Sequence, residues 1–182
     1  SVRAYTDQQV PRDVLDAILK DATTAPSWSN TRAFRVALAT GERADRLREE
    51  YVRRFNQTLE IQHHKRFATI KTALKRELPD GNVSAFNAPV MGFVFVHEKM
   101  LPWSAMDAGL MLQTLFLSAK ARGVDSCAIG VLSAWRGPVE QEFEIPPHYK
   151  LITGFCLGYA DTEAPINQVS APRPPIQLLE GK

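Results

Sequence analysis

Apolar residues recur three and four positions apart over residues 11–25, which is the spacing of one face of a helix. The positions are Val14, Leu15, Ile18, Leu19 and Ala22. Pro11 stands where the first turn of a helix tolerates proline, so we predict an amphipathic helix that ends near Pro26. From residue 42 the spacing returns in a heavily charged stretch, at Ala44, Leu47, Tyr51, Phe55 and Leu59. This second pattern predicts a long helix with a solvated polar face.

Four stretches have the composition of strands. Residues 34–40, "FRVALAT", and the short segment 126–129 are rich in apolar residues, and residues 150–160, "KLITGFCLGYA", are similar. Residues 88–98, "APVMGFVFVHE", are almost continuously apolar, as expected of a strand that is covered on both faces. Strands that alternate with helices indicate an α+β or α/β domain, and we expect residues 1–182 to form one domain.

The stretch "SAMDAGLMLQTLFLSAKARGV", residues 104–124, is apolar on every side of a helical wheel. A helix of this kind has to be buried on every side. A chain of 182 residues offers few partners for about five such turns, so a subunit interface is the natural cover and the pattern hints at a homodimer.

The remaining segments are simpler. A turn at Gly130 precedes a short helical piece at residues 139–143, and residues 63–78 continue in helical style with a basic cluster. The proline-rich tail, residues 165–175, predicts an extended arm without helix or central strand.

Composition excludes several classes of protein. The chain is 45% hydrophobic and 23% charged, and no apolar run reaches the ~18 residues of a membrane span. The first residues lack the features of a signal or transit peptide, so we expect a cytoplasmic protein without a membrane partner. With 22 Lys and Arg against 20 Asp and Glu, nucleic acid is a poor candidate partner. Cys127 and Cys156 are expected to be buried, reduced thiols.

Side-chain chemistry is scarce. His63 and His64 are adjacent and lack the spacing of a helical zinc pair, while His97 and His148 have the setting of surface residues, so we expect no metal site. No nucleophile elbow or glycine-rich phosphate loop occurs. The elbow "ATTAPSWSNTRAFRVAL", residues 22–38, is nevertheless unusually polar. This combination is typical of a protein in which a cofactor supplies the reactivity.

Four segments, taken in order, identify a family resemblance. They are "SVRAY" at the start, "APSWSN" at 25–30, "DAGLMLQTLFLSAKARGVDSCAIG" at 107–130, and "GFCLGYADTEAPINQ" followed by "APRPP" near the end. Together they resemble the FMN-dependent nitroreductases of the NAD(P)H-dependent, oxygen-insensitive type. The resemblance implies an α+β nitroreductase-like fold, with a central mostly antiparallel sheet flanked by helices, and a homodimer with FMN at its interface. It also implies that NAD(P)H reduces the flavin, which then reduces nitroaromatics, quinones or similar small-molecule acceptors by ping-pong hydride transfer.

The resemblance assigns the FMN phosphate to residues near both ends of the chain. Ser1 and Arg3 match the last two positions of the family's N-terminal phosphate motif, and Arg173 matches a second arginine near the C-terminus. A guanidinium offers a fork of donors to phosphate oxygens. Ala171 stands where relatives often carry another basic residue. The chain begins inside the phosphate motif and looks short between Gly81 and Asn82, so we expect residues to be missing at both places.

The polar elbow matches the family turn that lies against the flavin, commonly that of the partner subunit. Its residues are Pro26, Ser27, Trp28, Ser29 and Asn30. The Trp28 indole either forms a wall of the pocket or only packs. Relatives continue with Gln-Pro-Trp, whereas this chain has Arg32, Ala33 and Phe34. Arg32 either meets an acidic substrate or nucleotide phosphate or is a solvated loop residue.

A further group matches the family's contacts to the flavin ring. Ala128, Ile129 and Gly130 belong to the segment whose main-chain amides face N5 and O4, and the Ile129–Gly130 backbone is expected to tune the hydride step. Asn87 is matched to the pyrimidine edge. Gln113 makes either an interface hydrogen bond or a flavin contact. No side chain is expected to act as a catalytic acid, base or nucleophile, because the flavin carries the chemistry.

Two alternatives remain open. The same fold could act on flavin itself or on iodinated or other specialised substrates. A non-catalytic flavin-binding or nucleic-acid-binding protein is the other, and it rests on the basic cluster between Lys65 and Arg76. The physiological acceptor and the choice between NADH and NADPH lie beyond the sequence.

Overall fold

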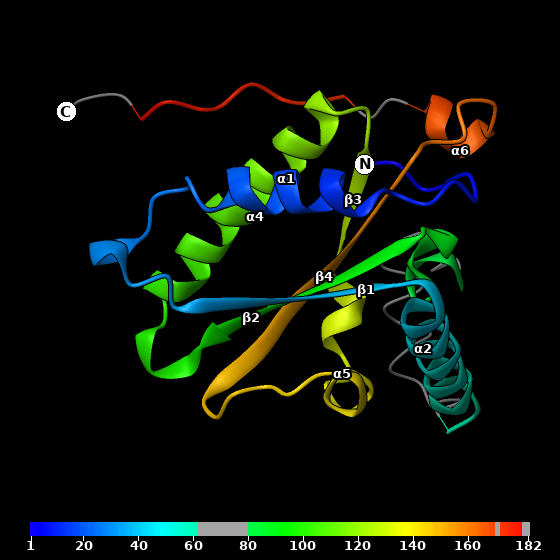
Figure 1. Cartoon of the computed structure of the whole chain (residues 1–182), viewed down its shortest axis with the longest axis horizontal. Helices are drawn as coiled ribbons and strands as arrows, with labels where there is room; N and C mark the ends of the chain where they lie inside the picture. Colours follow the sequence, from blue (N-terminus) through cyan, green and yellow to red (C-terminus); the bar gives the residue numbers. More distant parts are fainter. Residues whose placement is uncertain (62–79, 170–171, 180–182) are drawn as a thin grey trace.

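A four-stranded antiparallel sheet forms the centre of the molecule (Figure 1). The computed structural model describes residues 1–61, 80–169 and 172–179. The strands, in their order across the sheet, are β1 (Phe34–Thr40), β2 (Val90–His97), β4 (Tyr149–Gly158) and β3 (Asp125–Ile129). Every neighbouring pair runs antiparallel. The α+β expectation is therefore confirmed, and the α/β alternative is not.

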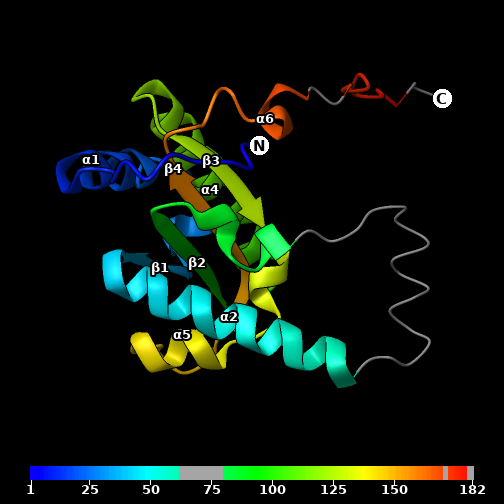
Figure 2. The same ribbon diagram turned by 90° about the vertical axis from the view of Figure 1, so that its right-hand side faces the viewer.

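Helices cover both faces of the sheet, as Figures 1 and 2 show. α1 (Arg12–Ala22) and α4 (Trp103–Ala121) pack on one face, and α2 (Gly41–Ile61) and α5 (Gly137–Glu142) pack on the other. Each layer has its own apolar cluster, since buried residues of α1 and α4 meet one side of β2 and those of α2 and α5 meet the other. Burial on this scale is the main force that holds such layers together.

The central strand β2 is buried along nearly its whole length, as its apolar sequence predicts. Its valines at 90, 94 and 96 enter the cluster with α1 and α4, while Met91, Phe93 and Phe95 enter the cluster with α2. Gly92 is required where Phe155 crosses the strand, because a Cβ on Gly92 would lie 2.2 Å from the Phe155 ring. A side chain at this position would force the two central strands apart.

α4 is buried on one side only within this chain. Met111 and Leu115 pack on the sheet, whereas the opposite side carries a strip of exposed apolar residues that we call the α4 strip. The α4 strip consists of Trp103, Met106, Leu110 and Leu117. Within the single chain the helix is therefore not covered on all sides, and its cover by a second subunit stays a prediction. Its physical basis holds, because the exposed side is as apolar as the buried one.

The C-terminal tail differs from its prediction at one point. Residues Pro165–Gln168 form a single helical turn, α6, and not extended chain. Pro165 lies in the first turn, where its missing N–H costs nothing and its fixed φ favours the helix. Residues 172–179 are exposed and have no regular structure, as expected. The basic cluster of residues 65–76, together with His63 and His64, lies outside the described residues.

Candidate functional site

The N-terminal segment lies along the outer edge of β3. The Val2 N–H donates to the Ser126 carbonyl (3.2 Å), and the Thr6 N–H donates to the Tyr159 carbonyl (2.9 Å). Arg3 is attached through its backbone, since its N–H donates to Asn167 Oδ1 (2.8 Å). Ser1 and Arg3 therefore lie beside β3 and α6, and the Arg3 side chain remains exposed to solvent.

Tyr5 attaches this segment to the sheet through its hydroxyl group. Its hydroxyl donates to the Val2 carbonyl (3.0 Å) and accepts from Cys156 Sγ (3.4 Å). Burial raises the pKa of Tyr5 above its ordinary value, so the phenol stays a neutral donor. Burial also raises the pKa of Cys127, and it raises the pKa of Cys156 to about 12. Both cysteines are free and buried, as predicted, and neither is a thiolate nucleophile near neutral pH.

The end of β3 presents main-chain donors at the edge of the sheet. Amide and carbonyl directions alternate along a strand, and the Ser126 carbonyl points outward to Val2. By the same alternation the Ala128 and Gly130 amides point outward, while the Ile129 amide points toward its partner Gly154 on β4. Ala128 and Gly130 are exposed and Ile129 is buried. Of the two amides we expected to tune the hydride step, the geometry favours that of Gly130.

The turn after β3 leaves room for a ligand at Gly130. A Cβ placed on this glycine would meet no atom within 4 Å. The next residues form η5 (Gly130–Ser133), in which the Ser133 hydroxyl donates to the Gly130 carbonyl (2.7 Å). Another group can therefore approach the backbone closely at this point.

The polar elbow is attached to α4 through a buried carboxylate. The Trp28 N–H donates to both carboxylate oxygens of Asp107, at 3.0 and 3.1 Å. Asp107 is 1% exposed and occupies an otherwise apolar helix, so this bond accounts for its burial. The Trp28 indole stacks on Trp103 with ring centroids 6.3 Å apart, yet it remains 47% exposed. Trp28 both packs and presents a face to solvent, so the two interpretations of its role are compatible.

The elbow is built from strained backbone. Ser29, Asn30 and Arg32 have φ values of 47°, 54° and 47°, in the left-handed region that side chains rarely adopt. Such residues cost roughly 1–3 kcal/mol each and cluster at functional sites. Local bonds hold this shape, because the Ser27 hydroxyl accepts the Arg32 N–H (3.3 Å) and Asn30 Oδ1 accepts from Arg32 Nε (3.1 Å).

The elbow and the N-terminal segment lie at opposite ends of α4 (Figure 1). Asp107, in the first part of α4, holds the elbow, whereas Lys120, near its end, pairs with Asp125 at the start of β3 (2.6 Å). The helix axis rises about 20 Å between these two residues. A single chain therefore does not bring the elbow residues together with Ser1 and Arg3.

The other candidate residues occupy separate places. Asn87 ends η3 (Ala85–Asn87), whose three residues have φ values of 52°, 54° and 54°, and it lines a small polar hollow with Thr6 and Asp7. Gln113 is exposed on the same side of α4 as the α4 strip. Arg173 is exposed in the extended tail. Within the described residues, no hydrogen bond or ion pair joins any of the three to Ser1, Arg3 or Gly130.

Neither of the two described histidines is among the candidate site residues. His97 ends β2 and is half-buried, and its Nδ1 is a buried nitrogen without a partner in the described chain. The His148 ring contacts the Glu98 carboxylate (3.2 Å). No group of three or more His, Cys, Asp or Glu among the described residues could hold a metal ion, and no described helix is long and apolar enough to cross a bilayer.

The donor set fits a phosphorylated flavin. An exposed guanidinium at Arg3, outward amides at the end of β3 and open space at Gly130 suit a phosphate and the polar edge of a planar ring. Sequence reasoning missed Tyr5, Asp107 and Asn167, which anchor these parts. The signal for Asp107 was a lone carboxylate in an apolar helix.

Comparison with known proteins agrees with this geometry. The chain is 30% identical to a 4-nitrobenzoate reductase of Nocardioides sp. (strain LMS-CY), over 97% of this chain and 83% of that one. It is 29% identical to a chloronitrobenzene nitroreductase of Comamonas testosteroni, over 94% and 87%. The solved FMN-dependent nitroreductase NfnB of Mycobacterium smegmatis, in complex with NADPH, superposes with a TM-score of 0.81 at 28% identity, over 96% and 90%. Because the nitroreductase family model also matches residues 1–159, the chain belongs to the nitroreductase family.

Proposed function

We propose that the protein is an FMN-dependent oxidoreductase that uses NAD(P)H to reduce nitroaromatic compounds, with residues 1–182 as one flavin-binding domain. The observation that carries the proposal is that the N-terminal segment with Arg3 is bonded along the same edge of β3 on which the Ala128 and Gly130 amides point outward, in a chain that belongs to this family. FMN, when bound, would supply the hydride chemistry. The protein would supply binding and orientation, since no described thiol is ionised near neutral pH.

In this proposal, Ser1, Arg3 and Arg173 bind the FMN phosphate. Ala128 and Gly130 present their amides to the ring, with Asn87 toward its pyrimidine edge. Residues 26–30 of the elbow would offer hydroxyl and amide groups to the ring and the ribityl chain. Gln113 would lie in the subunit interface, because it shares the exposed side of α4 with the α4 strip.

We further propose that the enzyme is a homodimer. The α4 strip exposes apolar side chains, with Leu117 62% and Met106 52% exposed, and Trp28 extends it at one end. Exposed apolar surface of this kind is typical of an interface. The elbow lies far from Arg3 within one chain, so a two-fold partner would bring its own elbow to complete each site.

Relatives suggest the class of acceptor. Two of them are, by name, a chloronitrobenzene nitroreductase and a 4-nitrobenzoate reductase, so both neutral and anionic nitroaromatics are reasonable substrates. Arg32 has an exposed side chain in the elbow, and Asn30 orients it. We place Arg32 at the pocket mouth, where it would favour an acidic substrate or the phosphate of the nucleotide.

Spectroscopy tests the function directly. The purified protein with FMN should be yellow, anaerobic NADPH or NADH should bleach it, and a nitroaromatic should restore the colour. Steady-state rates should give parallel double-reciprocal lines, because donor and acceptor would use one pocket in turn. Protein that stays colourless with excess FMN, or flavin that NAD(P)H does not bleach, would contradict the proposal. Salt-sensitive binding of nucleic acid by colourless protein would favour the alternative.

Arg3 provides the sharpest test of the phosphate site. Arg3→Ala removes an exposed guanidinium while the backbone bond to Asn167 stays, so we expect FMN affinity to fall about 10- to 100-fold with little change in thermal stability. Arg12→Ala is the control, because Arg12 is also exposed and its ion pair among the described residues is with Asp16 on α1. Equal FMN dissociation constants for the two variants, measured by flavin fluorescence, would refute the assignment.

A further inference from the structure

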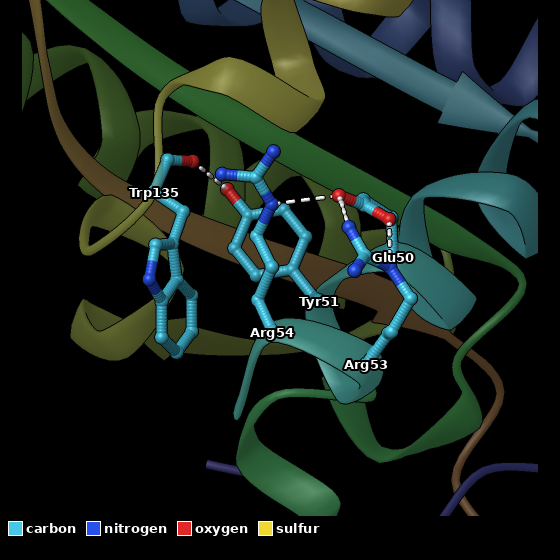
Figure 3. Close-up of polar contacts among 5 residues, drawn as sticks. All are labelled: Glu50, Tyr51, Arg53, Arg54 and Trp135. Carbon is cyan, nitrogen blue, oxygen red and sulfur yellow. Dashed lines mark hydrogen bonds and ion pairs between the residues drawn. The ribbon is translucent and has the colours of Figure 1, made fainter. Parts of the chain in front are cut away.

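Tyr51 in α2 directs its hydroxyl at two carbonyl groups of one loop. The ring is fully buried, and its oxygen lies 2.7 Å from the Leu132 carbonyl. It also lies 2.8 Å from the Trp135 carbonyl, the contact that Figure 3 shows. Phe93 stacks on the ring and Trp135 meets it edge-on, both with centroids 5.9 Å away. Because Phe93 and Trp135 both pack against the ring, they fix the direction in which the hydroxyl points.

The hydroxyl is a permanent donor. Burial raises the pKa of Tyr51 well above its ordinary value, so the phenol stays protonated throughout the working pH range. A phenol has one proton, and here that proton serves two carbonyls. Removing the oxygen would therefore leave two loop carbonyls without this donor.

The loop that Tyr51 holds is the continuation of β3. Leu132 belongs to η5, which begins at Gly130, and Trp135 lies just before α5. The Leu132 side chain is buried against Gly154, where a Cβ would approach it to 2.6 Å. The loop is thus fixed in two ways: Tyr51 in α2 donates to its carbonyls, and its own Leu132 side chain packs on the sheet at Gly154.

Gly130 depends on these neighbours for its orientation. It has no side chain of its own, and it is exposed with open space around it. The Ser133 hydroxyl connects it to the held loop through the Gly130 carbonyl (2.7 Å). The Gly130 amide points outward because Ile129 before it pairs with Gly154, and the loop that Tyr51 and Ser133 fix determines the path of the chain on the other side of Gly130.

We propose that Tyr51 is a positioning residue, which acts through the loop of residues 130–135 and preorganises the Gly130 amide for the flavin. The inference rests on the proposed function, because it names how that site is kept in shape. A donor that is already oriented costs no reorganisation when the ligand binds or reacts. The site would thus depend on a hydroxyl that no ligand touches.

Tyr51→Phe removes the oxygen and keeps the ring. Tyr149→Phe is the matched control, since Tyr149 belongs to the same apolar cluster and its hydroxyl makes no hydrogen bond within the described ranges. Hydrogen exchange of FMN-free protein is the first measurement. We expect exchange at residues 130–135 to become at least tenfold faster in Tyr51→Phe, with β2 and α1 unchanged, and no change in Tyr149→Phe.

FMN titration and the flavin spectrum are the second measurement. We expect the dissociation constant to rise about tenfold and the visible band of bound FMN to shift in Tyr51→Phe only. Ser133→Ala, which removes a partly exposed hydroxyl and not a core group, should change both in the same direction but less. It also keeps the test decisive if Tyr51→Phe folds poorly.

The outcomes separate the two proposals. Parent protein that binds no FMN contradicts the proposed function. Parent protein that binds FMN, together with Tyr51→Phe and Ser133→Ala variants that match it in loop exchange, affinity and spectrum, overturns the positioning role alone. Faster exchange spread evenly over the sheet would also overturn it, because a purely structural defect has that signature.

Discussion

In the proposed homodimer, Leu117→Glu should abolish both the dimeric state and the binding of FMN. Leu117 is 62% exposed on the α4 strip, so a glutamate there costs a free chain little but places a charge in a desolvated apolar interface. We expect sedimentation of the variant at micromolar concentration to show a monomer that carries no flavin absorbance. The unfolding temperature should also fall, and it should lose the dependence on protein concentration that a dimer shows.

Ile152→Glu provides the comparison. Ile152 is also exposed, but it belongs to β4 and lies outside the α4 strip, so the same kind of substitution should leave dimer and flavin intact. The joint loss in Leu117→Glu follows from the distance between the elbow and Arg3 in one chain. A flavin-bound Leu117→Glu monomer would contradict the shared site, even if the interface itself were placed correctly.

Periodicity predicted the fold well where one physical constraint dominates. β2 was recognisable because a strand buried on both faces needs continuous apolar sequence, and β1 was placed at residues 34–40, as observed. Apolar spacing predicted α1 at residues 11–25, and the helix spans Arg12–Ala22. It predicted that α2 starts at residue 42, and the helix begins at Gly41. The antiparallel character of the sheet was beyond periodicity and came from the family resemblance, whereas the order β1-β2-β4-β3 was not predicted.

The burial of α4 shows a limit of prediction from local sequence patterns. An apolar surface predicts that something covers the helix, but it does not say whether the cover is the same chain or a second one. The structure separates the two sides, with Met111 and Leu115 on the sheet and Leu110 and Leu117 exposed. The α6 turn shows a similar limit, because proline excludes the middle of a helix but favours its first turn.

The candidate site was only partly visible in the sequence. Side chains such as Arg3 and Ser29 could be selected from motifs, whereas their supports are contacts between distant residues. The bonds from Trp28 to Asp107 and from Tyr51 to Leu132 each join residues about eighty positions apart, and no local pattern encodes such a pair. Left-handed backbone at Asn30 and Asn87 was equally hidden, although asparagine tolerates that conformation better than most residues.

The direction of the amides at the end of β3 changes which substitution is informative. Proline at Ile129 would remove an amide that points toward Gly154, so it would damage the sheet whatever the flavin does. Gly130 is the better position. It begins η5, where proline fits a first helical residue, and Ile129 before it has the extended backbone (φ −131°, ψ 91°) that proline favours.

Gly130→Pro and Gly130→Ala form a matched pair, because both add a Cβ in open space and only proline removes the N–H. If this amide stabilises the charge that the reduced ring acquires, flavin reduction by NAD(P)H should be about 100-fold slower in Gly130→Pro than in Gly130→Ala. Stopped-flow bleaching of FMN-loaded protein measures both rates, and circular dichroism checks that both variants fold. Equal reduction rates at equal FMN occupancy would show that the Gly130 amide plays no part in the reaction. The comparison tests the main-chain donor at this position, since the two variants share the added Cβ and differ in the N–H and the proline ring.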